Sequence, residues 1–341
     1  MRIAFVLAGL IAVLVIAAAC GDDDGGGPTP TASRESSASS PEASDPPRRG
    51  VPPFSFDCAQ AYPGSTPDAS AFPVEVTDGS GRTLTLDAAP QTIASLSAGH
   101  TEILYAIGAA DAMTAVDNTS DCPDAVASLE HVDAFSPSVE SIVALEADLV
   151  VLFFDPGDLV QNLEGLGLDV LMMPSPTTID GVYEQIEILG EATGHAAEAG
   201  SLITAMTDAV AEITASVAAK PGPTFFHEVD NTYYTAGPGS FIADLYDQLG
   251  AENIAEPTGQ AFPQMSAEAI IAADPEVIIL ADEDAGESAE TVAARPGWGA
   301  IAAVQDGRVH VVSPDIVSRP GPRLVEALRT LAGYLYPEAL E

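Results

Sequence analysis

The sequence predicts an α/β protein of two Rossmann-like lobes with mainly parallel sheets, joined by a long rigid helix and separated by a ligand cleft. The first observation is an internal repeat, in which residues 138–152 are echoed by residues 266–280. Each copy has a Ser that can cap a helix, a Glu, a short apolar helix, an acidic turn and an apolar run. The period is too long for a solenoid and indicates two similar lobes.

Further observations support this fold. Residues 103–109 resemble 244–251, and residues 170–174 resemble 309–314. Between the two repeats, residues 196–219 keep a helical periodicity without a breaker, which at 1.5 Å per residue gives a helix roughly 36 Å long. A single long helix in this place is the expected connector between the lobes.

The first lobe, residues 54–178, begins with an irregular extension and a hairpin around Asp78-Gly79. Short apolar strands then alternate with helices, which indicates a parallel sheet. The expected strands are 92–97, 113–116, 149–154 and 170–173, and the expected helices are 100–108, 138–145 and 159–166.

Linking helices are expected over residues 179–191 and 196–219, within a connecting region that ends at residue 220. The second lobe then covers residues 221–341 and repeats the alternation of the first. Its expected strands are 224–229, 277–280 and 309–312, and its expected helices are 241–249, 267–272 and a last helix from Arg323.

The N-terminus predicts export. Arg2 precedes an unbroken apolar run, so residues 1–19 are a signal peptide. The run ends in three Ala before Cys20, which resembles a lipoprotein cleavage site; ordinary cleavage after Ala19 is the alternative. Residues 20–53 are rich in Gly, Ser, Pro, Thr and Asp, and we expect a lipid-anchored, disordered tether on the extracytoplasmic face of the membrane.

Charge and cysteine content restrict the partners and the compartment. The formal net charge is −40, which repels nucleic acid and anionic headgroups and favours cationic partners. An adaptation of the whole proteome to its habitat explains the acidity equally well. Cys58 and Cys122 predict a disulfide in an exported protein, with two buried free thiols as the alternative.

No catalytic motif is complete, and we expect neither an enzyme nor a cofactor. Ser240 lies in a Gly-rich turn that lacks the pattern of a nucleophile elbow, so we expect it to cap the next helix. His100 and His227 stand at equivalent strand-to-helix edges, where α/β sheets bind ligands. Local hydrogen bonding is the alternative for both histidines.

Other side chains stand at matching places in the two repeats. Glu140 and Glu268 each follow a capping Ser, and such a pair fits two arginines on a two-fold symmetric partner. Stabilisation of a helix N-terminus is the simpler alternative. Arg319 and Arg323 are candidates for binding an anionic ligand, with ion pairs as the alternative.

Aromatic residues suggest a binding surface for a large flat ligand, with lobe core as the alternative. They flank the repeated elements, and are Phe135, Phe153, Phe154 and Phe262.

At this point the chain resembles the helix-linked (class III) solute-binding proteins of ABC importers for cobalamin, ferric siderophores and haem. The matching segments are 93–104, 138–152, 234–242, 250–254, 262–280 and 319–323. The resemblance implies that Glu140 and Glu268 dock on permease arginines. It also implies a cleft lined by aromatic residues near Phe135, Phe153 and Phe262. Phe stands where Trp is common in cobalamin binders, and Cys122 where Tyr is usual.

The implied function is that of a monomeric, membrane-anchored receptor that captures a metal chelate and delivers it to a permease and ATPase complex. Cobalamin or another corrinoid is the first expectation, a ferric siderophore the second and haem the third. The alternatives are a zinc or manganese receptor using His100 and His227, and a surface hydrolase using Ser240 with His227. The expected cleft residues are His100, Thr119, Phe135, Phe153, Phe154, His227, Tyr234, Phe262, Arg319 and Arg323.

Overall fold

A computed structural model describes residues 54–282 and 285–338 of the chain. The expected signal peptide, Cys20 and the tether lie outside these residues. The described residues fall within one compact unit. Among them, no helix combines the length and the apolar character that crossing a membrane requires.

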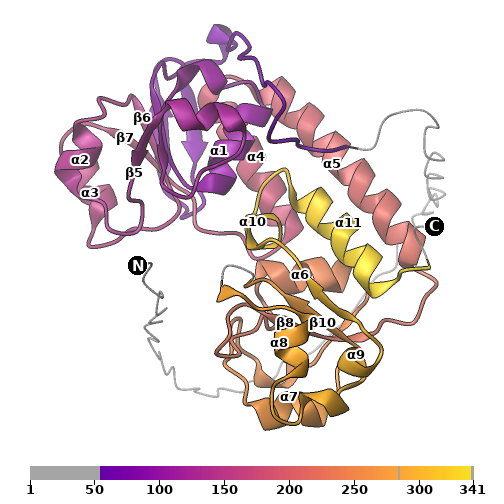
Figure 1. The fold of residues 1–341 in the computed structure, drawn as a ribbon. Coiled ribbons are helices and arrows are strands. Elements are labelled where there is room, and N and C mark those ends of the chain that lie inside the picture. Colours follow the sequence, from indigo (N-terminus) through magenta and orange to yellow (C-terminus); the bar gives the residue numbers. More distant parts are fainter. Residues whose placement is uncertain (1–53, 283–284, 339–341) are drawn as a thin grey trace, which may run out of the picture. The chain divides into compact units, whose positions relative to one another are not determined.

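The first lobe contains a five-stranded parallel sheet with the order β5-β4-β3-β6-β7 (Figure 1). Every residue of β3 and β6 is buried, as expected for strands covered on both faces. Its strands are β3 (Ile93–Leu96), β4 (Met113–Asp117), β5 (Glu130–Val132), β6 (Leu149–Leu152) and β7 (Asp169–Met172). Its helices are α1 (Ala98–Ala106), α2 (Val139–Val143) and α3 (Leu159–Glu164), and the predicted hairpin forms from β1 (Val74–Thr77) and β2 (Thr83–Leu86).

The second lobe contains a four-stranded parallel sheet with the order β11-β10-β8-β9. This is the order of the first sheet without a counterpart of β5. Its strands are β8 (Thr224–Glu228), β9 (Glu252–Asn253), β10 (Val277–Leu280) and β11 (Val309–Val311). Its helices are α6 (Phe241–Gln248), α7 (Ala267–Ala273), α8 (Ala289–Ala293), α9 (Ala302–Gln305), α10 (Pro314–Val317) and α11 (Leu324–Leu335).

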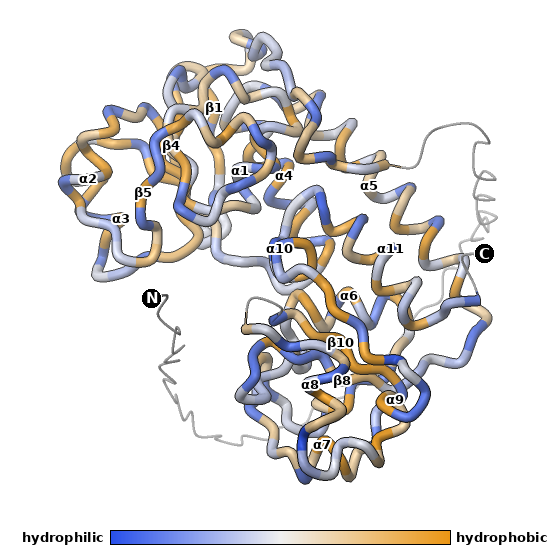
Figure 2. The backbone as a smooth tube through the Cα atoms, viewed as in Figure 1, coloured by the Kyte–Doolittle hydropathy of each residue, from blue (hydrophilic) through white to orange (hydrophobic). Residues whose placement is uncertain are grey.

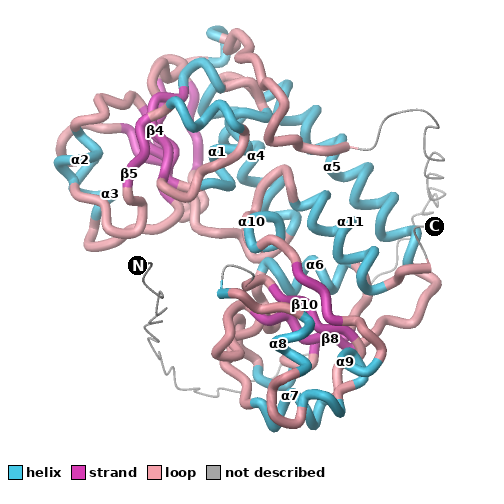
Figure 3. Tube along the Cα trace, in the orientation of Figure 1, coloured by secondary structure: helices cyan, strands magenta, loops and turns pink. Residues whose placement is uncertain are grey.

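Two helices connect the lobes, α4 (Ile179–Thr193) and α5 (Ala196–Val217). Helix α5 packs against α4 and against α11, and α4 also contacts α1, α6 and β1 (Figure 3). The long connecting helix predicted from the periodicity is therefore present, and it lies against elements of both lobes.

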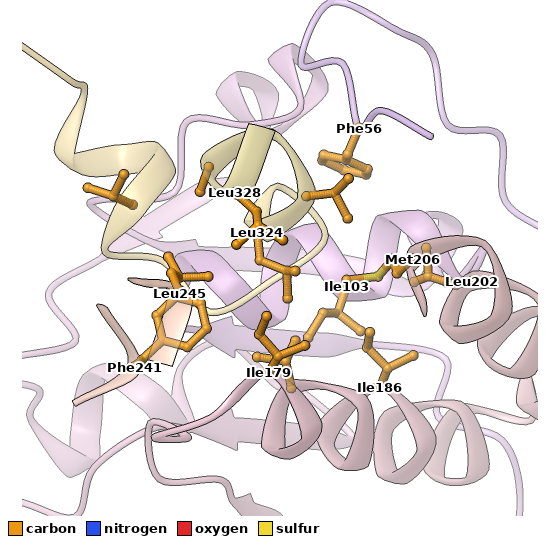
Figure 4. Packing of buried hydrophobic residues seen from close by; sticks show 14 of the residues in the cluster. Phe56, Ile103, Ile179, Ile186, Leu202, Met206, Phe241, Leu245, Leu324 and Leu328 are labelled. Atoms are coloured by element: carbon orange, nitrogen blue, oxygen red, sulfur yellow. The ribbon is translucent and has the colours of Figure 1, made fainter. Parts of the chain in front are cut away.

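The largest hydrophobic cluster runs through both lobes. It contains Ile103 of α1, Ile179 and Ile186 of α4, Leu245 of α6 and Leu324 of α11 (Figure 4). Along α5 and α11, apolar and polar positions follow one another on the tube of Figure 2. Because this core is shared, any opening of the lobes must separate packed side chains.

The duplication extends to individual hydrogen bonds at the start of the central strands. The acidic turns of the two repeats place Glu146 and Asp274 in the left-handed region, with φ of 50° and 49°. The side chain of Asp148 accepts a hydrogen bond from the amide of Thr92 at 3.1 Å, and that of Glu276 accepts one from Thr224 at 2.9 Å. The acidic turn identified in the sequence thus anchors the repeated helix to a neighbouring strand in both lobes.

The first helix of each lobe ends in the same way. Gly108 and Gly250 adopt φ of 90° and 71°, a conformation in which Gly is favoured over other residues. The next amide donates to a carbonyl five residues back, from Ala109 to Leu104 at 2.9 Å and from Ala251 to Tyr246 at 3.2 Å. This explains the likeness of residues 103–109 and 244–251.

Some predicted details were wrong. The predicted strand 149–154 ends at Leu152, and the chain bends at Phe153. The short elements β5, β9, α8 and α10 were missed, since none carries a full period of apolar residues. The predicted disulfide between Cys58 and Cys122 is present and joins the N-terminal extension to the segment after β4.

Candidate functional site

The topology of each sheet identifies the edge at which a ligand is expected. The chain runs from β3 to β4 and β5 on one side, and then to β6 and β7 on the other. The second sheet reverses in the same way at β8, between β9 and β10. Open α/β sheets bind ligands at the carboxyl ends of the strands where the order reverses. The candidate site therefore lies after β3 and β6 in one lobe and after β8 and β10 in the other.

Three phenylalanines gather at this edge of the first lobe, and we call them the phenylalanine cluster. The ring centroids of Phe135 and Phe153 are 5.6 Å apart at 74°, and those of Phe153 and Phe154 are 5.5 Å apart at 44°. Phe135 is 46% exposed and Phe154 is 37% exposed. Asp133 positions the cluster, since its carboxylate accepts a hydrogen bond from the Phe135 amide at 2.9 Å. Neighbouring exposed aromatics are typical of a binding surface.

The second lobe exposes Tyr234 and Phe262. Tyr234 pairs with Gln264 in an antiparallel bridge, and its carbonyl accepts a hydrogen bond from Val229, which directly follows β8. The amide of Thr235 donates to the carbonyl of Pro263 at 3.0 Å. The two aromatic side chains therefore lie on adjacent segments after β8.

A network of charged residues lies at the carboxyl end of the second sheet. Arg295 donates to Glu228, the last residue of β8, at 2.6 Å and to Glu287 at 2.7 Å. Its guanidinium lies 5.2 Å from the Tyr233 ring centroid and 4.6 Å from that of Trp298. The network holds Arg295 between two carboxylates and two aromatic rings.

Asp282 lies at the end of β10 beside this network. Its side chain is buried, and neither carboxylate oxygen has a hydrogen-bond partner among the described residues. Burial and the nearby Glu228 carboxylate raise the pKa of Asp282 to about 7. In the sequence, only its place as an acidic residue after an apolar strand marks this group.

This raised pKa predicts a change in stability with pH. A carboxyl group with a higher pKa in the folded than in the unfolded chain stabilises the fold at low pH, and the contribution is lost as the pH rises through 7. We expect the wild-type protein to lose about 2 kcal/mol more than Asp282→Asn between pH 5 and pH 8. Urea denaturation of both proteins across this range measures the difference, and parallel curves would contradict the assignment.

Arg323 is engaged by the protein itself. It is 7% exposed, and its Nε and Nη2 donate to Glu102 of α1 at 3.1 and 2.6 Å. The approach of the two lobes here requires Gly99, since a Cβ at that position would lie 2.3 Å from the carbonyl oxygen of Pro320. Arg323 joins the lobes. Its burial does not fit the predicted direct role in ligand binding.

Arg319 is also occupied by carboxylates. It donates to Asp121 and to Asp315, each at 2.5 Å. Both arginines therefore form ion pairs in this structure, which was the alternative prediction from the sequence.

The two candidate histidines are core residues. His100 is 3% exposed, with its Nε2 3.0 Å from the amide oxygen of Gln185, and burial lowers its pKa to about 4. His227 is fully buried, with its Nδ1 2.8 Å from the Tyr246 hydroxyl, and burial lowers its pKa to about 3. Their assignment to the ligand-binding surface was wrong, because a place at a strand end does not determine depth.

The side chains predicted for a metal receptor and for a hydrolase are engaged elsewhere in the described part of the chain. Within residues 54–282 and 285–338, no group of three or more His, Cys, Asp or Glu side chains is arranged to hold a metal ion. Ser240 is buried, accepts a hydrogen bond from the Ala243 amide at 3.1 Å and donates to the Gly237 carbonyl at 2.8 Å. It caps α6, as expected, and His227 is occupied by Tyr246.

Three further predicted residues are exposed. Thr119 follows β4, and its amide donates to Asp117 at 2.9 Å. Glu140 and Glu268 are the second residues of α2 and α7, whose capping serines accept hydrogen bonds at 3.0 and 3.2 Å. Neither glutamate forms an ion pair within the described part of the chain.

Sequence comparison identifies the family to which this arrangement belongs. Residues 93–316, which hold both sheets and the connecting helices, match the family described as periplasmic binding protein. The chain belongs to the periplasmic binding protein family. Its structural relatives in that family have two lobes, which agrees with the fold described above.

Relatives extend over most of the chain. An uncharacterized ABC transporter substrate-binding lipoprotein of Bacillus subtilis (strain 168), YvrC, is 32% identical over 280 residues, which cover 79% of this chain and 88% of the relative. A cobalamin-binding protein of Halobacterium salinarum (strain ATCC 29341 / DSM 671 / R1) is 30% identical over 280 residues, 77% of this chain and 74% of the relative.

Solved structures of similar fold include a possible iron-binding (periplasmic solute-binding) protein of Staphylococcus epidermidis. It is 28% identical with a TM-score of 0.66, and the match covers 72% of this chain and 99% of that one. The periplasmic vitamin B12-binding protein of Vibrio cholerae has a TM-score of 0.65 at 23% identity, covering 74% of this chain and 99% of its own. At that identity the likeness shows the fold alone.

Proposed function

We propose that the protein is the substrate-binding component of an ABC importer and captures a metal chelate between the carboxyl edges of its two sheets. The phenylalanine cluster carries this proposal, because it exposes the rings of Phe135 and Phe154, with Phe153 between them, at the carboxyl edge of the first sheet. In the second lobe, Tyr234 and Phe262 offer a second aromatic contact at the corresponding edge.

A corrinoid is the ligand that this surface fits best. Its flat conjugated macrocycle has apolar faces for aromatic contact, and its peripheral amides need hydrogen-bond partners such as the exposed Thr119 and Tyr234. The Halobacterium salinarum relative is named for cobalamin binding. A ferric siderophore is the second candidate and haem the third.

We further propose that the protein works as a lipid-anchored monomer outside the cytoplasmic membrane. Cys20 would carry the lipid, and the relative of Bacillus subtilis is named a lipoprotein. The exposed Glu140 and Glu268 would dock on arginines of a two-fold symmetric permease, which works with its ATPase.

The phenylalanine cluster predicts a loss of ligand affinity on truncation. Phe135→Ala is expected to weaken corrinoid binding about tenfold, which corresponds to ~1.4 kcal/mol. Leu166→Ala is the matched control, since this apolar side chain is 61% exposed at the end of α3 and lies outside the cluster. Isothermal titration with cyanocobalamin measures both variants, and an equal effect of the two substitutions would contradict the role of the cluster.

A further inference from the structure

Acidic residues stand at the carboxyl ends of several strands around the proposed site. Asp117 and Glu228 are the last residues of β4 and β8, and Asp133, Asp155 and Asp282 lie within three positions of the ends of β5, β6 and β10. Glu228 is paired with Arg295, whereas Asp133 and Asp155 are exposed and form no ion pair within the described residues. These two residues flank the phenylalanine cluster along the chain, so this part of the edge carries negative charge.

The cations near these edges are already neutralised. Arg295 is bound by Glu228 and Glu287, and Arg319 by Asp121 and Asp315. Arg323 is buried against Glu102. Each of these three guanidinium groups is therefore already paired with at least one carboxylate of the protein, which reduces its attraction for an anionic ligand.

The remaining basic residues of the described chain are engaged or placed elsewhere. Arg82 pairs with Asp78 and Glu164, while Arg308 and Arg329 donate to backbone carbonyls. Lys220 precedes the amino end of β8, which is the opposite edge of that sheet.

Asp282 adds an independent observation. The residue is 6% exposed just after β10, and its carboxyl group lies close enough to that of Glu228 for the two to interact. Burial and the Glu228 carboxylate raise its pKa, because a second negative charge is unfavourable at this edge, and an anionic ligand would meet the same repulsion.

We propose, building on the proposed function, that the site selects neutral or cationic chelates and discriminates against anionic ones. A carboxylate brought to about 10 Å from one fixed carboxylate, at an effective dielectric constant of about 20, binds roughly tenfold more weakly than its neutral counterpart. Asp133 and Asp155 are two such groups next to the phenylalanine cluster. The selection favours a corrinoid with amide groups over haem with two propionates and over ferric tricatecholates.

A matched pair of ligands tests the selection. The probes are cyanocobalamin and the monocarboxylic acid made from it by hydrolysis of one peripheral amide. We expect the acid to bind roughly tenfold more weakly at low ionic strength, with a smaller difference as NaCl screens the charges. Coupling the acid to a diamine forms an amide that ends in an ammonium group, which removes the negative charge and is expected to restore affinity. Equal affinity for the acid and the amide would overturn the proposal.

Matched variants distinguish the effect of the local carboxylates from the effect of the protein's overall charge. The test variant combines Asp133→Asn and Asp155→Asn. The control combines Glu187→Gln and Glu212→Gln, which are exposed on α4 and α5 and remove the same charge. Discrimination between amide and acid should shrink severalfold in the test variant only. An equal change in both variants would overturn the role of the strand-end carboxylates.

A second ligand pair makes this inference independent of the corrinoid assignment. The pair is a ferric trihydroxamate with a free ammonium group and the same chelate succinylated at that nitrogen. If the protein prefers the ammonium form and does not bind corrinoids, the corrinoid assignment is refuted and the charge selection is supported. Equal or stronger binding of the succinylated form would overturn the charge selection whatever the corrinoid result.

Discussion

Replacement of both Glu140 and Glu268 by Arg is expected to abolish ligand uptake while leaving ligand affinity unchanged. The two carboxylates are exposed at the same position of the repeated helices α2 and α7. If they form charge-assisted hydrogen bonds with two permease arginines, reversal replaces two attractions with two repulsions. Each single reversal should leave partial uptake.

Uptake of radiolabelled cobalamin by proteoliposomes containing the permease and ATPase measures this effect, with titration of the free variant as the affinity readout. Glu187→Arg with Glu212→Arg is the matched control, because it makes the same change of charge on exposed positions of α4 and α5. Loss of the favourable helix N-terminal carboxylates costs about 0.3–1 kcal/mol each, so the variant should remain folded. Normal uptake by the double reversal would refute the docking role.

Arg323→Ala is expected to lower the free energy of unfolding by about 3–5 kcal/mol. The substitution leaves the fully buried carboxylate of Glu102 without the guanidinium that donates to it at 2.6 and 3.1 Å. The pair also joins α1 to the N-terminus of α11, where the lobes share their core. We therefore expect the variant to be less stable and its lobes less tightly associated.

Arg319→Ala provides the control, four residues away. Its partners Asp121 and Asp315 have side chains that are 58% and 42% exposed, and such pairs contribute about 0–1 kcal/mol. Its contact with Glu102 is long, at 3.9 Å, and Arg323 still donates to that carboxylate in the control. Guanidinium chloride denaturation compares the two variants. The double variant Glu102→Leu with Arg323→Leu should recover much of the loss, since it removes the isolated charge. Equal stability of Arg323→Ala and Arg319→Ala would contradict the structural role of the buried pair.

The sequence was informative where a pattern repeats locally. The duplicated acidic turn predicted two equivalent units, and the structure places Glu146 and Asp274 in the same left-handed conformation. Strands such as β10 were predicted because a run of apolar residues between polar turns is typical of a buried parallel strand. Short elements such as β9 lack that pattern and depend on their neighbours in the sheet.

Contacts between residues that are far apart in the chain could not be predicted from the sequence. Glu102 and Arg323 are 221 residues apart, and no local period relates them. His100 was placed at the correct strand end but on the wrong side, because the third residue of α1 points into the core. The phenylalanine cluster was predicted from its strand ends, and its exposure required the structure.

The most direct test of the account is a calorimetric titration of the wild-type protein with cyanocobalamin, a ferric siderophore and haem. We expect saturable binding of one cyanocobalamin per chain, weakened by Phe135→Ala and unaffected by Leu166→Ala. Absence of saturable binding for all three ligands would contradict the proposal that this protein captures a metal chelate.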